Sequence, residues 1–180
     1  MLLIDVSYFT SGPRQIVNAS TAQMPLQGSQ VVNNTIEGYI EAFQMEFLIN
    51  IAGHRLAGYI KDYLDMIEQE EDAQSADKSE TVEVAEQSPF EVICEKIREP
   101  FADYVFFHIL RDMNTQATIT GLVRLKCANE YVSPIQRQVS IWNGMVKKNK
   151  EFVYWASSKE CNHNVVISAN LLTPINTFNL

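Results

Sequence analysis

Residues 36–56 read IEGYIEAFQMEFLINIAGHRL and contain the pattern that decides the fold. Apolar residues recur there at the spacing of an amphipathic helix, at Ile36, Ile40, Phe43, Phe47 and Ile51. Asn34 is well placed as the N-cap, and Glu37 would complete a capping box. Gly53 should end this helix, because glycine commonly provides the left-handed C-terminal residue and costs about 1 kcal/mol inside a helix. We therefore expect two helices that meet at Gly53, in preference to one continuous helix that tolerates Gly53 and Gly58.

Further helices are predicted on both sides of an acidic stretch. The apolar period restarts at Leu56 and continues to Ile67, which predicts a second helix that ends near residue 68. Two later tetrapeptides, Ser88-Pro89-Phe90-Glu91 and Ser133-Pro134-Ile135-Gln136, share one pattern. Each places serine at the N-cap, proline at the first helical position and Glu or Gln at the third. They predict the starts of a third and a fourth helix.

The third helical run contains the most apolar turn of the chain. Val105–Leu110 is apolar on nearly all sides, which predicts the centre of the core. Pro100 should kink or split this helix near Glu99, because proline lacks an amide hydrogen and clashes with the preceding turn. His108 lies inside the apolar turn, and we expect a hydrogen-bonded core histidine there.

The residues before and after the last predicted helix carry short patterns of their own. The β-branched, alternating residues from Thr118 to Val123 predict a short extended segment or hairpin arm. A short helical turn is expected over Arg124–Tyr131, and the last helix should run from Pro134 to about Ser157 with its apolar stripe inward. Residues 165–167, Val-Val-Ile, are expected to form a strand.

Both ends of the chain lack a helical period. Residues 1–34 contain Gly, Pro, Ser and Asn, and we interpret them as an extended N-terminal arm with one short strand at Leu2–Tyr8. Residues 161–180 are interpreted as a C-terminal arm. The predicted fold is therefore mainly α, a small bundle of four to five helices over residues 35–160 with extended arms and a disordered acidic loop at 68–87.

The net charge of −8 comes almost entirely from one stretch. Residues 68–86 hold eight acidic residues and a single base, Lys78, so that the rest of the chain is nearly neutral. This stretch has no bulky apolar residue and cannot offset its ordering entropy, which predicts a mobile loop or a frayed helix end. The overall balance excludes a broadly basic nucleic-acid binder, and no apolar run approaches the ~18 residues of a membrane span. An acid at Asp5 with no basic residue before it argues against a secretory signal.

The sequence offers little for catalysis or metal binding. Cys94, Cys127 and Cys161 cannot all pair, which fits a reducing compartment. Cys161 and His163 are close in sequence, yet zinc sites usually take paired ligands from two places. His108 and Asp112 have a spacing that lets them meet on a helix, which is common on any helix. We expect no catalytic residue, no cofactor, no metal and no small-molecule substrate.

A basic run makes the last helix a candidate interface. Lys147, Lys148 and Lys150 form the densest group of bases in the chain, and the same helix carries Arg137 and Trp142. The group is interpreted first as a solvated helix face. It can also contact phosphate, the acidic segment, or an acidic face of a neighbouring copy. A patch of this size gives at most weak, salt-sensitive binding to nucleic acid.

The order of these motifs resembles the small head-tail connector (adaptor) proteins of tailed phages and prophages. The resemblance covers residues 36–67 and 88–156, and each motif by itself is short and of low specificity. The motifs that carry it are Tyr39-Ile40-Glu41-Ala42, Phe47-Leu48, Ile51-Ala52-Gly53-His54-Arg55-Leu56, Ala102-Asp103-Tyr104-Val105-Phe106-Phe107, Thr120-Gly121-Leu122-Val123 and Trp142-Asn143. The acidic insert after the second helix departs from the family pattern.

The resemblance implies a structural virion protein without an active site. Such a protein is a small helical bundle that assembles as a ring, docks under the portal and receives the tail. Its arms and loops carry the contacts between subunits. We therefore expect self-assembly, contacts with portal and tail proteins, a weak DNA contact in the ring lumen at most, no membrane, and localisation to the virion, with host cytoplasm before assembly.

Two other functions are consistent with the same residues. The first is a non-viral helical protein-interaction domain that uses a helical groove or binds a basic partner through its acidic loop. The second is an enzyme that uses His108 or the Cys161–His163 pair. The connector remains the preferred hypothesis.

Overall fold

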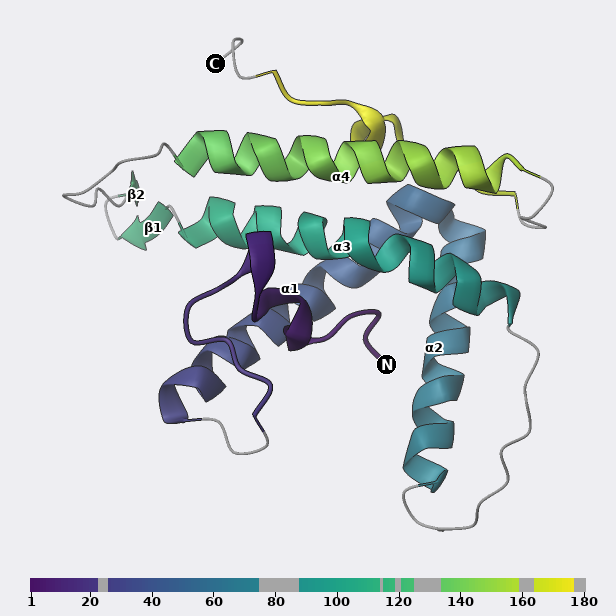
Figure 1. Ribbon diagram of the computed structural model, residues 1–180, viewed down its shortest axis with the longest axis horizontal. Helices are drawn as coiled ribbons and strands as arrows, with labels where there is room; N and C mark the ends of the chain where they lie inside the picture. The colour runs from purple at the N-terminus through teal and green to yellow at the C-terminus, as the bar shows by residue number, and fades with distance from the viewer. Residues whose placement is uncertain are drawn as a thin grey trace.

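The computed structural model describes residues 1–22, 26–74, 88–113, 115–118, 121–124, 134–158 and 164–176. Within these ranges the protein is mainly α-helical, as predicted (Figure 1). The helices are α1 (Gln27–Ala52), α2 (His54–Gln74), α3 (Pro89–Met113) and α4 (Pro134–Ala156). Three short 3-10 helices are η1 (Val6–Phe9), η2 (Gly12–Arg14) and η3 (Ala169–Leu172), and two short strands are β1 (Thr115–Thr118) and β2 (Gly121–Arg124).

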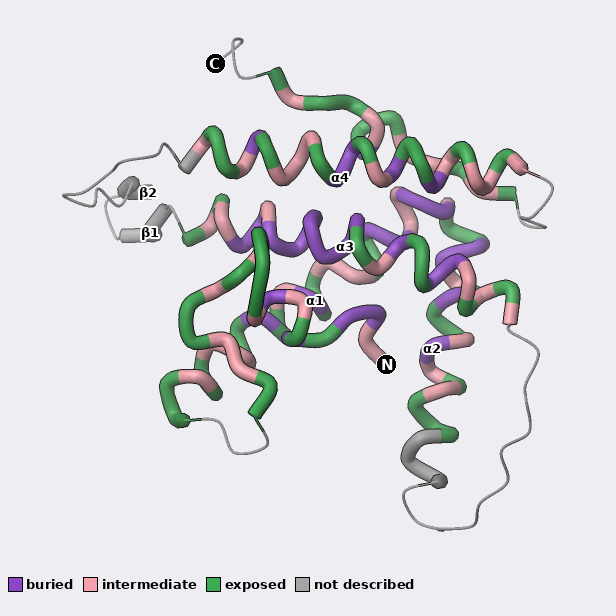
Figure 2. Tube along the Cα trace, in the orientation of Figure 1, coloured by how far each residue is buried: buried purple, intermediate pink, exposed green. Residues whose placement is uncertain are grey.

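Helix α3 is the centre of the arrangement. It lies alongside α4 over most of its length, and α1 crosses it on the opposite side (Figure 1). α2 leaves the corner at the end of α1 and extends away from α4. Buried residues line α3 and the sides of the other helices that face it (Figure 2). The core is therefore built around α3, and the outer face of α4 is left for other contacts.

The turn between α1 and α2 forms at Gly53, as predicted. Gly53 has φ +82°, in the region that favours glycine, and its N–H donates to the Ile49 carbonyl at 2.9 Å. A Cβ at this position would lie 3.4 Å from the Val166 Cβ. The last carbonyls of α1 accept backbone N–H groups from the C-terminal segment, with Ser168 donating to Asn50 at 2.6 Å. The segment 164–168 thus caps α1 and is not the predicted strand.

The N-terminal region differs most from the prediction. α1 begins at Gln27, so that neither the N-cap at Asn34 nor the arm boundary at residue 34 is correct. Leu2–Tyr8 is not a strand, because η1 occupies Val6–Phe9 with Asp5 as its N-cap. Four side chains of this segment, Leu3, Ile4, Val6 and Phe9, belong to the core. Burial of these apolar groups favours a compact segment over an extended arm.

The acidic stretch begins inside a helix. α2 continues to Gln74, so that the loop predicted from residue 68 is wrong for residues 68–74. The N-terminal ammonium group pairs with Asp65 at 3.3 Å and also with Glu68, which anchors this part of α2 to the start of the chain. Residues 75–87, the remainder of the predicted disordered loop, lie outside the described residues.

Helix α3 is continuous through Pro100, so that the predicted split near Glu99 does not occur. Pro100 is buried within the continuous helix. Ser88 caps the helix as predicted, although its Oγ accepts from the Phe90 N–H at 3.4 Å instead of the third amide. The predicted core turn is confirmed, because Val105–Phe106 and His108–Ile109 are buried.

The prediction of a short extended segment or hairpin arm at Thr118–Val123 is met in part, because two short strands pair in the connection from α3 to α4. β1 pairs with β2 in antiparallel register, with Thr115 opposite Arg124 and Thr118 opposite Gly121. Arg124 belongs to β2, and the rest of the expected helical turn, residues 125–131, lies outside the described residues. α4 begins at Pro134 and ends at Ala156, within one residue of the expected end.

Candidate functional site

The five predicted interface residues lie on α4, but they do not share one surface. Lys147 and Lys150 are exposed and make no ion pair with any described residue. Arg137 donates to the Pro13 carbonyl at 3.0 Å and lies 5.1 Å from the Phe106 ring centroid. Because successive residues are turned by about 100° around a helix axis, Lys147 and Lys148 point in different directions.

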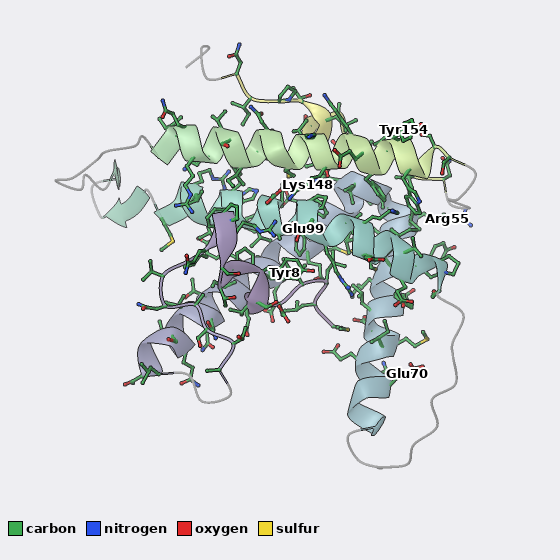
Figure 3. The ribbon with its side chains drawn as sticks, viewed as in Figure 1. Tyr8, Arg55, Glu70, Glu99, Lys148 and Tyr154 are labelled. Atoms are coloured by element: carbon green, nitrogen blue, oxygen red, sulfur yellow. The ribbon has the colours of Figure 1, made fainter. Side chains whose placement is uncertain are left out.

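Lys148 belongs to a charged cluster that joins three segments of the chain. The cluster consists of Arg14 from η2, Glu99 and Asp103 from α3, and Lys148 from α4. Figure 3 labels Glu99 and Lys148 on the adjacent helices α3 and α4. Asp103 is 5 % exposed, and each of its two oxygens pairs with a cation at 2.8 Å. Glu99 contacts the same two cations at 2.9 and 3.2 Å. The two positive and two negative charges balance, and this pairing offsets part of the cost of burying the Asp103 side chain.

The electrostatics of Glu99 reflect these contacts. Hydrogen bonds from Arg14 are the main reason that the pKa of Glu99 lies below its usual value, and Lys148 acts in the same direction. The ionised form of Glu99 is therefore stabilised by folding. Since all four groups of the cluster are paired with one another, the arrangement fits a structural clamp between the N-terminal segment and the α3–α4 pair.

Two adjoining hollows flank this cluster and share Glu99 and Lys148. One has a volume of about 350 Å³ and is lined on its apolar side by Pro100, Phe152 and Trp155. The other, of about 260 Å³, lies between η2 and α4. Lys96 lies over the Trp155 ring, with its Nζ 4.9 Å from the centroid. Together they form a shallow groove along α3 and α4 with mixed charge.

His108 is buried, as predicted, but the predicted hydrogen bond is wrong. Neither ring nitrogen has a hydrogen-bond partner in the described part of the chain. The imidazole stacks on Phe43 at 4.0 Å between centroids and meets the edge of Tyr104 at 4.6 Å. Burial lowers the pKa of His108 to about 4, and the positive charge of Arg111 acts in the same direction.

The His108–Asp112 hydrogen bond suggested by the helical spacing does not form. Asp112 instead accepts a hydrogen bond from the Tyr39 hydroxyl at 3.2 Å and pairs with Arg111 at 3.3 Å. His108 therefore faces aromatic rings on α1 and α3.

Cys94 is a buried cysteine on α3. It is 1 % exposed, and burial raises the pKa of its thiol to about 11. Cys127, Cys161 and His163 lie outside the described residues. Over residues that the structure describes, no three His, Cys, Asp or Glu side chains are grouped as metal ligands.

Trp142, Asn143 and Asn149 hold the C-terminal segment against α4, and the sequence analysis named only Trp142 of these as an interface residue. We call residues 164–176 the C-terminal strap. The Trp142 indole donates to the Thr173 carbonyl at 3.0 Å, so that this predicted interface residue is engaged within its own chain. Asn143 both donates to the Ile175 carbonyl at 3.0 Å and accepts from the Ile175 N–H at 2.8 Å.

Asn149 makes the third contact with the strap. It is fully buried and donates to the Leu171 carbonyl at 2.9 Å. A sequence signal for this contact exists, because Asn149 is a polar residue on the apolar stripe of Val139, Trp142 and Val146. A buried amide at such a position requires a hydrogen-bond partner from another segment.

No family model, curated protein or solved structure matches this chain. No helix in the described ranges is long and apolar enough to cross a membrane.

Proposed function

We propose that this protein is a structural virion protein of a tailed phage or prophage, a head-tail connector that assembles as a ring and docks between portal and tail. It acts by binding neighbouring proteins, without a catalytic residue or cofactor. Its partners are further copies of itself and the portal and tail proteins, and Lys147 and Lys150 are the exposed bases available for a neighbour or for DNA in the lumen. It is located in the virion, and in the host cytoplasm before assembly.

The observation that carries this proposal is the order of the elements. A helix ends at the left-handed Gly53, a second helix follows at once, and then come a third helix, a hairpin and a long last helix. This is the order of the sequence motifs that resemble the connector family. The glycine matters because its positive φ sets the sharp corner between α1 and α2.

Exposed apolar side chains on the helices also support assembly. Tyr154 on α4 is 84 % exposed, and Tyr59 and Met66 on α2 are nearly half exposed. Single exposed apolar residues are normal on any protein. Two helices that both carry large exposed side chains, however, provide surface that association can bury.

The test is assembly of the full chain alone and with a portal protein from the same genome. Light scattering after size exclusion and negative-stain electron microscopy should show rings of one defined order. Lys147→Glu together with Lys150→Glu should weaken assembly, whereas Glu41→Lys, a charge reversal at an exposed position of α1, serves as the control. A chain that remains monomeric at high concentration and does not bind the portal contradicts the proposal.

A helical protein-interaction domain remains the second candidate, favoured by the groove beside Glu99 and Lys148 and by the acidic end of α2. Neutralising the acidic residues Glu70, Glu71, Asp72, Asp77, Glu80, Glu83 and Glu86 with Gln and Asn separates the two candidates, because it removes the charge of this segment and keeps its length. The connector should still assemble after these substitutions, while a domain that binds through the acidic segment should lose its partner.

A further inference from the structure

Helix α2 carries a stripe of exposed side chains on the side that no described helix covers. From the corner at Gly53 the helix extends away from α3 and α4 (Figure 1). Tyr59 and Met66 are 46 % and 49 % exposed, and Asp62 between them is exposed as well. No residue in the described ranges forms an ion pair with Asp62. We call Tyr59, Asp62 and Met66 the α2 stripe.

Helix α4 carries a second stripe on its solvent side. Lys147, Lys150 and Tyr154 are all exposed, and they remain so with the C-terminal strap in place. Neither lysine takes part in an ion pair within the described part of the chain. We call these three residues the α4 stripe. Residues at i, i+3 and i+7 lie within about 60° of one another around a helix axis, so that each stripe occupies one side of its helix.

The two stripes have the same spacing, which lets them lie along one another. Positions i, i+3 and i+7 are those that meet along the seam of two parallel helices. In register, the stripes pair Lys147 with Tyr59, Lys150 with Asp62, and Tyr154 with Met66. The first pair covers an aromatic ring with an aliphatic stem, the second is an ion pair, and the third brings a thioether to an aromatic ring. A shift by one helical turn loses the ion pair.

The charges of the two helices are also complementary. α2 contains six acidic and two basic residues, whereas α4 contains four basic residues and one acidic residue. Opposite net charges favour contact of α2 with α4 over contact of either helix with its own copy. Within one chain, α2 extends away from α4 (Figure 1), and no ion pair between described residues joins them. The complementary surfaces therefore belong to different copies of the chain.

We propose that the α2 stripe of one copy docks in parallel on the α4 stripe of a second copy, with the ion pair of Asp62 and Lys150 at its centre. This inference rests on the proposed self-assembly and names the two surfaces that carry it. A chain that docks through α2 still offers its own α4 stripe, so that the contact repeats from copy to copy. The acidic residues that follow Gln69 lie beyond the stripe, and the contact does not depend on their charge.

The experiment exchanges the central charges between copies of the full chain. Asp62→Lys places like charges opposite each other, and so does Lys150→Glu. Each variant alone should therefore associate about tenfold more weakly than wild type in sedimentation velocity. An equal mixture of the two variants should recover the wild-type association. In the mixture, native charges oppose each other across one contact and exchanged charges oppose each other across the next.

Two double variants serve as controls for position and net charge. A chain with both Asp62→Lys and Lys150→Glu should associate as wild type does. A chain with Lys150→Glu and Glu41→Lys has the same net charge and should stay weak, because Glu41 is at an exposed position of α1. Recovery in the mixture also shows that each single variant is folded. Failure of both the mixture and the exchanged chain to recover overturns the inference, as does a wild-type chain that does not associate with itself.

Electron microscopy of the same samples with and without portal separates this inference from the proposed function. If the charge exchange restores association but no ring forms in either condition, the α2–α4 contact is supported and the connector function fails. If wild type and both single variants form rings on the portal equally well, the connector function is supported and the α2–α4 contact is wrong.

Discussion

The buried His108 predicts a specific loss of stability on acidification. The pKa of His108 is about 4 in the folded chain against an ordinary value of 6.5. The unfolded chain therefore takes up the proton first as the pH falls. The stability contribution of the neutral imidazole is fully present above pH 6.5 and is lost as the pH falls from 6.5 through about 4. A difference of about 2.5 units corresponds to about 3 kcal/mol at 1.36 kcal/mol per unit.

The groups around the imidazole explain why the pKa of His108 is lowered. Arg111 opposes protonation, while Glu46 and Asp112 favour it, and burial outweighs both carboxylates. Phe43 and Tyr104 cover the ring, so that no described hydrogen bond stabilises the cation. The slope of unfolding free energy with pH should approach about 1.4 kcal/mol per unit in the middle of this window.

The assay is urea unfolding of wild type and His108→Leu at several values between pH 7.5 and 4.5. Other carboxylates also titrate at the acidic end, so the quantity that matters is the difference between the two proteins. At pH 7.5 we expect His108→Leu to be at least as stable as wild type, because it removes two unpaired buried nitrogens. Its advantage should grow by about 2–3 kcal/mol as the pH falls. A difference that stays constant with pH refutes the reasoning.

Three further perturbations follow from the fold and the clamp. Arg14→Ala should lower the free energy of unfolding by about 3 kcal/mol, because it leaves the buried Asp103 with one cation. Urea unfolding measures this change, and a loss below about 0.5 kcal/mol would show that the four-residue cluster does not stabilise the fold. Gly53→Ala should cost about 1–3 kcal/mol, because φ +82° is strained for alanine and Val166 lies within contact distance; an unchanged thermal midpoint would show that the corner does not need glycine. Cys94 should resist iodoacetamide at pH 8 in the folded chain, because its thiol is buried and its pKa is about 11; mass mapping that finds Cys94 labelled as fast as in urea rules out this packing.

The helices and their main boundary were predictable because they depend on local patterns. The apolar period of residues 36–51, the glycine at 53 and the Ser-Pro starts all act through neighbours in the same helix. The N-terminal segment was mispredicted for the opposite reason. Phe9 is buried through its packing on Phe106, with 6.5 Å between the ring centroids, and no local pattern announces such a contact.

The candidate site was predictable only in part. The predicted helix does carry the interface residues, but Lys148 pairs with Glu99 and Asp103, and Asp103 also binds Arg14, 89 positions earlier in the sequence. A single sequence contains no pattern that predicts ion pairs between residues so far apart. The division of the lysine run was foreseeable, since adjacent residues on a helix face different directions.

The clamp also fixes when the chain can finish folding. Arg14 leaves the ribosome 89 residues before its partner Asp103, and Lys148 follows later still. At the ~5–20 residues per second of synthesis, the apolar N-terminal segment waits several seconds or more for its site. A product that stops before α4 would lack the ion pairs of Lys148 with Glu99 and Asp103. The same four residues that hold the finished protein together thus make synthesis of α4 a requirement for the complete clamp.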